Sequence, residues 1–479
     1  MLAPWVTKEL KTADLKDERL NARLREVLSQ FAARPTASIP AACGGRAEME
    51  AAYRLFDNDQ VTFENILESH CRVTCERIAA QDVVILAQDT TEVDLTRPEQ
   101  QVRGAGPLNE GTRWGALLHL LHAFTPDGTP LGTVHAVPWV RDQTPRPALT
   151  GAGRAAIPLE EKESYRWVVA LRRAQEEALR QPGTRIICVA DSEADIYELL
   201  AEGSDASQAA EWIIRAGQNR ALQPSAKPGP PAHLREEPLR QPVLFTHTIS
   251  VRGRKAKVAC CQRGRQQPRR SRQTEVEVRA ACVTLRAPWR PGQKLPSVSV
   301  HVVLVREPNP PQGDEAVEWI LLTSLPIEHL EQVRQVVEYY CVRWMLEVFF
   351  RTLKTGCRAE ERRFEQIDRQ LRCLAVYLIV TWRTLYVCRL GRRCPEISCD
   401  VIFEPSEWKA VYRIVRNKTP PRKPPALGEM VRMVAQLGGY VHRRRSDPPG
   451  PQTVWLGLQR MHDFARCWET FGPGAKSPP

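Results

Sequence analysis

Four polar side chains share one face of a predicted helix in the segment EYYCVRWMLEVFFRTLKTG: Tyr340, Arg343, Glu347 and Lys354. A helical step of about 100° per residue brings all four within about 60° of one another. Apolar side chains form the adjacent stripe, which must face the core: Val342, Leu346, Phe349 and Leu353. A polar stripe beside a buried one is typical of a helix that lines a cleft. An Arg343–Glu347 surface pair, the simpler interpretation, would contribute only a few tenths of a kcal/mol.

Two aspartates follow predicted buried strands, Asp89 after VVILAQ and Asp191 after RIICVA. Functional groups gather at the carboxyl ends of strands in α/β sheets. Taken alone, each aspartate is explained more simply by a local turn or a helix cap. Glu347 makes a shared functional site the better interpretation, because three carboxylates together form a set of hard oxygen ligands.

Such a site suits Mg²⁺, with Mn²⁺ as a substitute, rather than zinc. Two ions about 3.5–4 Å apart would activate a water or a 3′-hydroxyl and stabilise both oxygens of an in-line phosphoryl displacement. Arg343 and Lys354, on the same helix face, would hold the flanking phosphates. The residues alone therefore predict metal-dependent phosphoryl transfer.

The elements that must position these residues follow an α/β order with a mixed sheet. Strands are predicted at 83–89, 113–124, 129–140, 185–191 and 211–217, with helices at 160–180 and over ADIYELLAEG. Residues 220–317 interrupt this order with proline-rich stretches and alternating β segments, which predicts a β-rich basic insertion. A long helix at 328–355 and further helix to about residue 390 complete the central part.

The two ends of the chain read as helical, which gives expected domains at 1–72, 73–390 and 391–479. Three short helices at the N-terminus make a module of the size that often binds DNA, or equally a lead-in that packs on the next domain. In the tail, apolar stripes that include Leu427, Val434 and Met461 fit either pairing with another chain or an intramolecular core.

Composition narrows the class of protein. The 479 residues are 42% hydrophobic and 26% charged, as in a globular protein, with no apolar run of about 18 residues. We expect a cytoplasmic protein without a secretory signal, whose 14 cysteines are reduced thiols. The net charge of +12 suggests a polyanionic partner.

The positive charge is concentrated in one segment. Residues 215–300 carry 18 Lys and Arg against 4 acids, whereas residues 1–70 have a net charge of −2. We expect the basic insertion to supply much of the salt-sensitive affinity for DNA, through a cluster such as Arg252, Arg254, Lys255 and Lys257.

These motifs resemble the DDE transposases of the bacterial insertion-sequence IS-four family, close to the Tn-five transposase. The spacing of the four-residue stripe matches the YREK signature of that family without a gap. QDTTEVDLT resembles the first-aspartate motif and ADSEADIYELL the second; EKESYRW, WILLTSLP and the C-terminal tail also resemble family segments. One departure is Gln88, where a near relative carries an acid.

The resemblance implies an α/β fold: an RNase H-like catalytic core with a β-rich insertion, flanked by N-terminal and C-terminal all-α domains. It implies Asp89, Asp191 and Glu347 as a triad that binds Mg²⁺. The implied function is cut-and-paste transposition of double-stranded DNA by a homodimer. One strand is nicked at the transposon end, a hairpin forms and is resolved, and the 3′-hydroxyl ends are joined to target DNA.

The resemblance also implies residues that contact DNA: Arg23, Tyr53, Arg215, Trp319, Tyr340, Arg343, Lys354 and Arg363. Trp319 matches an aromatic that stacks a flipped base, an interaction worth about 1–3 kcal/mol per base. Structural interpretations remain open, with Trp319 as strand core and Tyr53 as a packing aromatic. Two other functions also remain open: a metal-dependent nuclease without strand transfer, and an inactive or domesticated derivative that only binds DNA.

Overall fold

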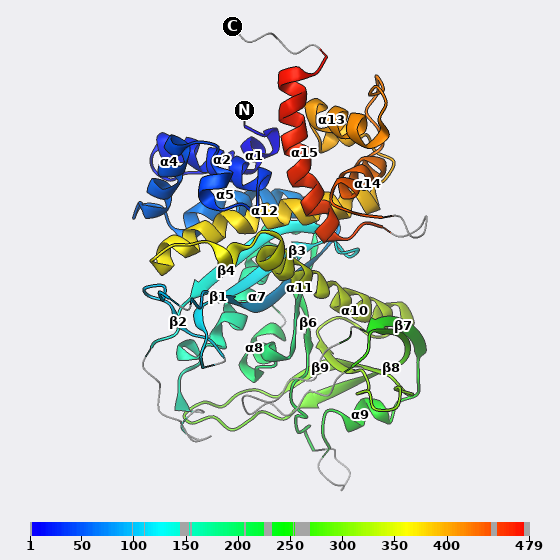
Figure 1. Ribbon diagram of the computed structural model, residues 1–479. Helices are drawn as coiled ribbons and strands as arrows, with labels where there is room; N and C mark the ends of the chain where they lie inside the picture. The colour runs from blue at the N-terminus through cyan, green and yellow to red at the C-terminus, as the bar shows by residue number, and fades with distance from the viewer. Residues whose placement is uncertain are drawn as a thin grey trace.

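The computed structural model describes residues 2–97, 99–109, 111–143, 153, 156–205, 207–224, 232–251, 253, 269–441 and 448–473. Within this part of the chain, helices at both ends of the sequence lie together above a large sheet (Figure 1). The four basic residues singled out at 252–257 lie outside the described residues.

Five strands form the core of the sheet. The central strand β1 (Val83–Asp94) pairs antiparallel with β3 (Trp114–Phe124) and parallel with β5 (Arg185–Ala190). On the outer sides, β3 pairs antiparallel with β4 (Pro130–Trp139), and β5 pairs parallel with β6 (Glu211–Arg215). The resulting order β4-β3-β1-β5-β6, with one antiparallel and one parallel half, is the RNase H-like arrangement that we expected.

The β-rich insertion continues this sheet instead of forming a separate one. Beyond β6 the order runs β10 (Glu318–Thr323), β9 (Val298–Arg306), β8 (Arg272–Leu285) and β7 (Phe245–Val251), every neighbour antiparallel. A two-residue strand, β2 (Gly106–Pro107), lies at the opposite edge beside β3. The ten strands of the described residues therefore belong to one sheet.

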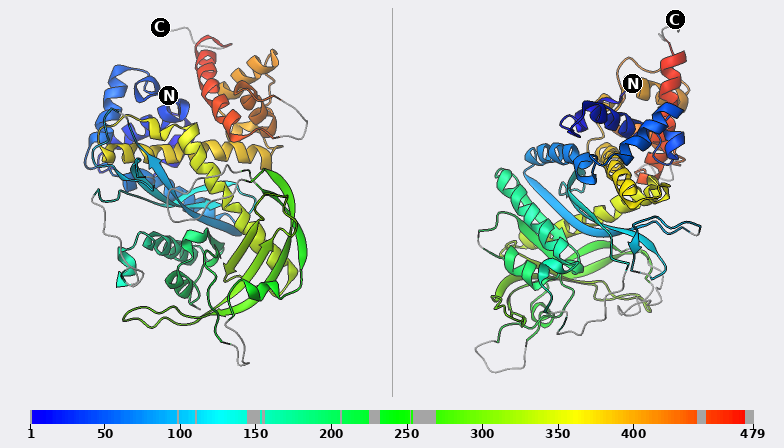
Figure 2. Two further views of the ribbon diagram at one scale, coloured as in Figure 1. Left: turned by 60° about the horizontal axis from the view of Figure 1, so that its bottom comes forward. Right: turned by 90° about the vertical axis from the view of Figure 1, so that its left-hand side faces the viewer.

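Helices cover both faces of the sheet, because successive side chains of a strand point to opposite faces. Val84 and Leu86 of β1 face the layer that contains α7 (Tyr165–Arg180) and α8 (Tyr197–Gly203). The alternate residues of β1 belong to a second core cluster, which includes α10 (Leu330–Val342), α11 (Trp344–Arg351) and α12 (Ile367–Arg393). The turned views in Figure 2 show these two layers.

The helix predicted at 328–355 is present but irregular. It passes from α10 to α11 at Arg343, and its last turn, Thr352–Gly356, is a π-helix. In that turn the backbone N–H of Cys357 donates to the carbonyl oxygen of Thr352 at 2.8 Å, five residues back. Residues after Thr352 are therefore rotated away from the positions that a regular 100° step predicts.

The N-terminal helices pack on α12 and share its core cluster. The ring of Phe31 stacks on that of Tyr377 with centroids 5.2 Å apart. The fifth of these helices runs to Ala79, beyond the expected boundary at residue 72. Their bounds are α1 (Pro4–Glu9), α2 (Glu18–Ala33), α3 (Ile39–Ala42), α4 (Arg46–Asp57) and α5 (Phe63–Ala79).

The C-terminal helices form their own small core with the end of α12. They are α13 (Pro405–Arg416), α14 (Leu427–Leu437) and α15 (Pro451–Phe471). Leu427, Val434 and Met461 are buried in this core, so these three side chains pack within the chain. The short elements of the chain are α9 (Glu236–Leu239), η1 (Leu159–Glu161), η2 (Ser192–Ala194), η4 (Ala359–Glu361) and η5 (Cys399–Val401).

Helix α12 is long and apolar enough to cross a membrane by length and composition alone. However, 78% of its most apolar window is buried inside the protein, as expected of the central helix on which both helical ends pack.

Candidate active site

The three predicted catalytic carboxylates come from neighbouring elements. Asp89 lies within β1, Asp191 directly follows β5, and Glu347 lies on α11. The parallel register of β1 and β5 pairs Ala87 with Val189, and two further residues along both strands put Asp89 level with Asp191. The Asp191 carboxylate caps η2 by accepting the backbone N–H of Glu193 at 2.8 Å. The cap interpretation of Asp191 is therefore correct locally, and compatible with a site role.

Arg343 joins two of the three carboxylates. Its Nη1 donates to Asp89 Oδ2 at 2.9 Å, and its Nη2 donates to Glu347 Oε1 at 2.7 Å. The Arg343 side chain is only 12% exposed. Burial disfavours its charge, but Tyr340, Asp89 and Glu347 outweigh that penalty and raise the pKa of Arg343.

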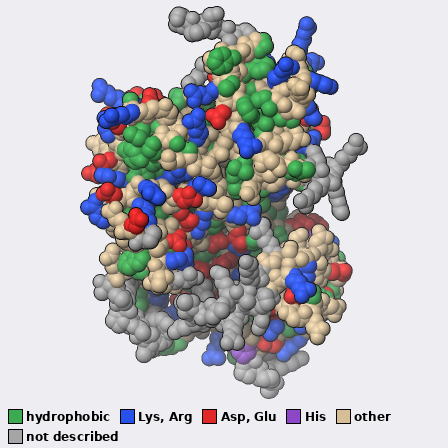
Figure 3. Space-filling view, viewed as in Figure 1, with side chains coloured by type: hydrophobic (Ala, Val, Ile, Leu, Met, Phe, Trp, Pro, Cys, Tyr) green, Lys and Arg blue, Asp and Glu red, His purple; other side chains and the backbone are tan. Residues whose placement is uncertain are grey.

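Asp89 carries an electrostatic cost. Burial, together with the nearby charges of Asp191 and Glu347, raises its pKa to about 7, although Arg343 and the backbone N–H of Thr90 act in the opposite direction. Asp89 is thus close enough to both other carboxylates for their charges to disfavour its own. Viewed as in Figure 1, the molecule is hollowed near its middle, and acidic side chains are visible inside the hollow (Figure 3).

The donor set fits a hard divalent cation, since carboxylate oxygens are the ligands that Mg²⁺ and Mn²⁺ prefer. Among the described residues, no three His, Cys, Asp or Glu side chains lie close enough to hold one ion as they stand. The Arg343 guanidinium lies between Asp89 and Glu347, and its positive charge balances these two carboxylates. Binding an ion would therefore require Arg343 to move and the carboxylates to draw together.

Several predicted DNA contacts line a cavity of about 610 Å³ next to these carboxylates. These contacts are Arg215, Trp319, Tyr340 and Arg343, and the predicted catalytic residue Glu347 lines the same cavity. The rings of Trp319 and Tyr340 lie 5.5 Å apart at an angle of 58°. Trp319 packs against the main core cluster, as the strand-core interpretation expects, although the residue is only partly buried. Arg215 donates to Ser192 Oγ at 3.2 Å, which places it beside the Asp191 turn.

Lys354 does not point toward the three predicted catalytic carboxylates. Its Nζ donates to the backbone oxygen of Glu92 and lies 3.3 Å from Glu360 Oε1. Because Lys354 belongs to the π-helical turn, the regular helical step does not predict its direction.

The other three predicted DNA contacts lie away from the cavity. Arg363 is exposed on the segment between η4 and α12. Arg23 of α2 pairs with Glu26 at 2.6 Å. The Tyr53 ring packs edge-on against Phe364 at 5.9 Å, as the packing interpretation expects, although the residue is only partly buried.

Two residues near the site were missed by the sequence reasoning. Asp195 accepts hydrogen bonds from Arg220 and from the backbone N–H groups of Gly217 and Gln218, at 2.6–3.0 Å. Arg166 reaches from α7 to residues next to both aspartates. Both lie within segments noted as family-like, ADSEADIYELL and EKESYRW, but nothing in their spacing distinguishes them.

Three transposase family models match the chain in order. A transposase DNA-binding model matches residues 2–61, a transposase DDE domain matches 169–382, and a transposase Tn5 dimerisation domain matches 379–469. The DDE match includes Asp191 and Glu347 but not Asp89. One solved structure found by similarity is a cryo-EM structure of the piggyBac transposase synaptic complex with hairpin DNA. It is 9% identical over 79% of this chain and 67% of that chain, with a TM-score of 0.37. From the three family models, in this order on an RNase H-like core, we conclude that the chain is a DNA-binding DDE transposase with domains of the Tn5 type.

Proposed function

We propose that this transposase moves DNA by cut and paste, with Asp89, Asp191 and Glu347 as the catalytic triad. The observation that carries the proposal is the pairing of one buried arginine with Asp89 and Glu347, while Asp191 lies level with Asp89 on the neighbouring strand. Such a concentration of carboxylates is costly unless a cation is bound, and it is typical of sites built for divalent ions.

The metal would be Mg²⁺, with Mn²⁺ able to replace it. When bound, it would make a water or 3′-hydroxyl nucleophilic and stabilise the leaving oxygen of the phosphodiester. The chain's own residues would hold the substrate. Arg343, once released from the carboxylates, would bind a phosphate next to the scissile bond through its planar fork of donors. Tyr340 and Arg215 would line the same stretch of backbone.

Trp319 would hold a base that leaves the double helix. Its partly exposed ring borders the cavity beside the carboxylates, so a nucleotide adjacent to the cleaved bond could stack there. Removing that base from the stack would let the freed 3′-hydroxyl reach the opposite strand. The proposed order is therefore nicking, hairpin formation, resolution of the hairpin, and joining of the 3′-hydroxyl ends to target DNA.

We propose that two copies act together, each cutting the DNA end held mainly by the other. The support is the match of residues 379–469 to a dimerisation domain. We also propose that the chain is a member of the IS-four family and that Tyr340, Arg343, Glu347 and Lys354 are its YREK signature. We propose that it acts in the cytoplasm.

The test is cleavage of a DNA fragment that carries the inverted repeats bounding the gene, resolved on a denaturing gel. We expect Glu347→Gln to slow nicking by more than about 100-fold, because the substitution removes a charged metal ligand. The affinity for the repeats should be unchanged. Glu338→Gln is the matched control, since Glu338 is an exposed acid on the preceding helix.

Nicking by Glu347→Gln at the wild-type rate would contradict the proposed triad. Binding of the repeats by the wild-type protein without any cleavage would instead favour a derivative that only binds DNA.

A further inference from the structure

Arg166 of α7 connects the segments that carry Asp89 and Asp191. Its Nε donates to Thr90 Oγ1 at 2.9 Å, and Thr90 directly follows Asp89. Its Nη2 lies 3.2 Å from Glu193 Oε2, two residues after Asp191. The Arg166 guanidinium therefore links the strand segment that carries Asp89 to the turn that carries Asp191.

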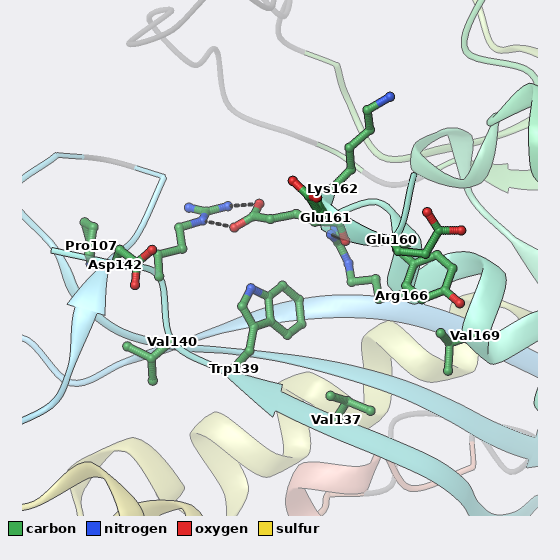
Figure 4. A pocket seen from close by; sticks show the side chains of 13 residues that line it. Pro107, Val137, Trp139, Val140, Asp142, Glu160, Glu161, Lys162, Arg166 and Val169 are labelled. Atoms are coloured by element: carbon green, nitrogen blue, oxygen red, sulfur yellow. Dashed lines mark hydrogen bonds and ion pairs between the residues drawn. The ribbon is translucent and has the colours of Figure 1, made fainter. Parts of the chain in front are cut away.

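The Arg166 side chain is itself firmly held. Its carbon Cζ lies 5.0 Å from the ring centre of Trp139 on β4 and 5.6 Å from that of Trp167. Its Nη1 donates to the carbonyl oxygen of Glu163, and the side chain is 15% exposed. Figure 4 shows Arg166 beside Trp139 in the pocket between α7 and β4. Packing of this kind fixes the direction of the guanidinium fork.

A one-way chain of hydrogen bonds continues from Thr90 into the core. Thr90 Oγ1 lies 2.9 Å from His119 Nδ1, and His119 Nε2 lies 3.3 Å from Gln88 Oε1. The Gln88 amide then donates to Cys188 Sγ at 3.3 Å.

The direction of this chain follows from the donors at its ends. Because the Gln88 amide nitrogen donates to the thiol, its oxygen must accept, so His119 carries its proton on Nε2. His119 Nδ1 then accepts from Thr90, whose oxygen accepts from Arg166 in turn. Burial, followed by the charge of Arg166, lowers the pKa of His119 well below its usual value, which agrees with this neutral form.

The chain holds both neighbours of Asp89. Side chains alternate along a strand, so Gln88 and Thr90 point to the face opposite Asp89. Thr90 and His119 are also direct cross-strand partners in β1 and β3. The strand that presents Asp89 is therefore fixed on its far face by residues of α7, β3 and β5.

We propose that Arg166 is a positioning residue that, through Thr90 and Glu193, sets the spacing between Asp89 and Asp191 for binding of the divalent cation. The proposal rests on the proposed function, because it takes both aspartates as metal ligands. The family models do not identify Arg166, Thr90 or Glu193, which support the two aspartates without being proposed as metal ligands.

The test is binding of Mn²⁺ alone to the full-length protein, measured by calorimetry and by the electron paramagnetic resonance signal of free Mn²⁺. Thr90→Val keeps the shape of the side chain but removes the hydroxyl that links Arg166 to His119. We expect it to raise the Kd for Mn²⁺ about 10-fold, as is usual when an outer partner of a metal ligand is lost. Thr90→Ser restores the hydroxyl and should bind as the wild type does.

A second pair of variants keeps the test valid if Thr90→Val fails to fold. Arg166→Lys retains the charge but cannot donate to Thr90 and Glu193 from one planar group, so the Kd should again rise about 10-fold. Arg172→Lys is the matched control. Arg172 lies on the same helix and forms a two-point pair with Glu202 at 2.7 and 2.9 Å. Its other hydrogen-bond partner is Tyr165, so its bonds reach neither Thr90 nor Glu193.

Asp191→Asn separates the two proposals. If Asp191→Asn abolishes Mn²⁺ binding while Thr90→Val and Arg166→Lys bind as the wild type does, the positioning role is wrong and the metal site stands. If Asp191→Asn binds Mn²⁺ as the wild type does, the proposed metal site fails, and the positioning role fails with it.

Discussion

His70 is a buried histidine whose proton position follows from its neighbours. Its Nε2 accepts the backbone N–H of Thr133 at 3.0 Å, so the ring proton must be on Nδ1, which lies 2.5 Å from Glu9 Oε1. Glu9 is also held by Arg77, at 3.0 Å for each of two contacts. This cluster joins α1, α5 and β4, and protonation of His70 would remove its acceptor for Thr133.

The cluster predicts a specific dependence of stability on pH. Burial, which outweighs the charge of Glu9, lowers the pKa of His70 below its usual 6.5 in the folded protein. A lowered pKa means that the stabilisation is present above pH 6.5 and is lost as the pH falls below it. Glu9 stays ionised in this range, because Arg77 and His70 outweigh its burial and lower its pKa to about 2.

We therefore expect His70→Gln to reduce the free energy of unfolding by about 1–3 kcal/mol at pH 8, through the loss of buried hydrogen bonds. The difference from the wild type should shrink as the pH falls to 5, since only the wild type loses the contribution of His70. Urea denaturation of both proteins across this range measures it. A difference that stays constant with pH would contradict the neutral form of His70.

Single residues of the candidate site were predictable where a local pattern marks them. Asp89 and Asp191 each follow an apolar run, and Glu347 lies on a periodic polar stripe. Only Asp191 lies at the end of its strand, because β1 continues past Asp89 to Asp94. Lys354 belongs to the same stripe, but the π-helical turn changes its direction, and no residue type in TLKTG signals that turn. The contacts of Arg166 were not predictable, because they join α7 to two segments that are distant in the sequence.

At the scale of elements, the start of the insertion depends on one buried ion pair. Asp195 is 1% exposed and Arg220 is 10% exposed, with Asp195 Oδ1 2.6 Å from Arg220 Nη2. The other carboxylate oxygen accepts the backbone N–H groups of Gly217 and Gln218, directly after β6. The second aspartate of ADSEAD thus has a structural role four residues after the proposed catalytic one.

Asp195→Asn should lower the free energy of unfolding by about 3–5 kcal/mol, because it leaves the Arg220 charge buried without its partner. Asp205→Asn, at an exposed aspartate of the turn before β6, is the control and should have little effect. Thermal denaturation of both variants measures the difference. Equal midpoints for the two variants would contradict the structural role of Asp195.

The sequence predicted most of the strands but not how the insertion joins the core. Alternation of apolar residues identifies β7, β8 and β9 as strands. Their place in the sheet depends on the antiparallel pairing of β10 with β6, whose residues lie about a hundred positions apart. No local pattern encodes a partner at that distance.

At the scale of the whole molecule, the basic segment 215–300 has a net charge of +14, from 18 Lys and Arg against 4 acids. This value overstates the positive charge that is free to bind DNA. Several of its arginines pair with acids outside the segment: Arg220 with Asp195, Arg235 with Glu318, Arg272 with Glu307, and Arg290 with Glu198. The cluster from Arg252 to Lys257 lies outside the described residues, so its contribution to salt-sensitive DNA binding stays a prediction.

The central claim is that the same carboxylates both cut DNA and join it to a target. The most direct test uses pre-cut transposon ends with free 3′-hydroxyls, a target plasmid and Mg²⁺. We expect joined product with the wild-type protein, none with Glu347→Gln, and none when the ends carry 3′-dideoxy termini. Hydrolysis of the ends without joined product would contradict transposition and identify a nuclease, and joining by Glu347→Gln would contradict the triad.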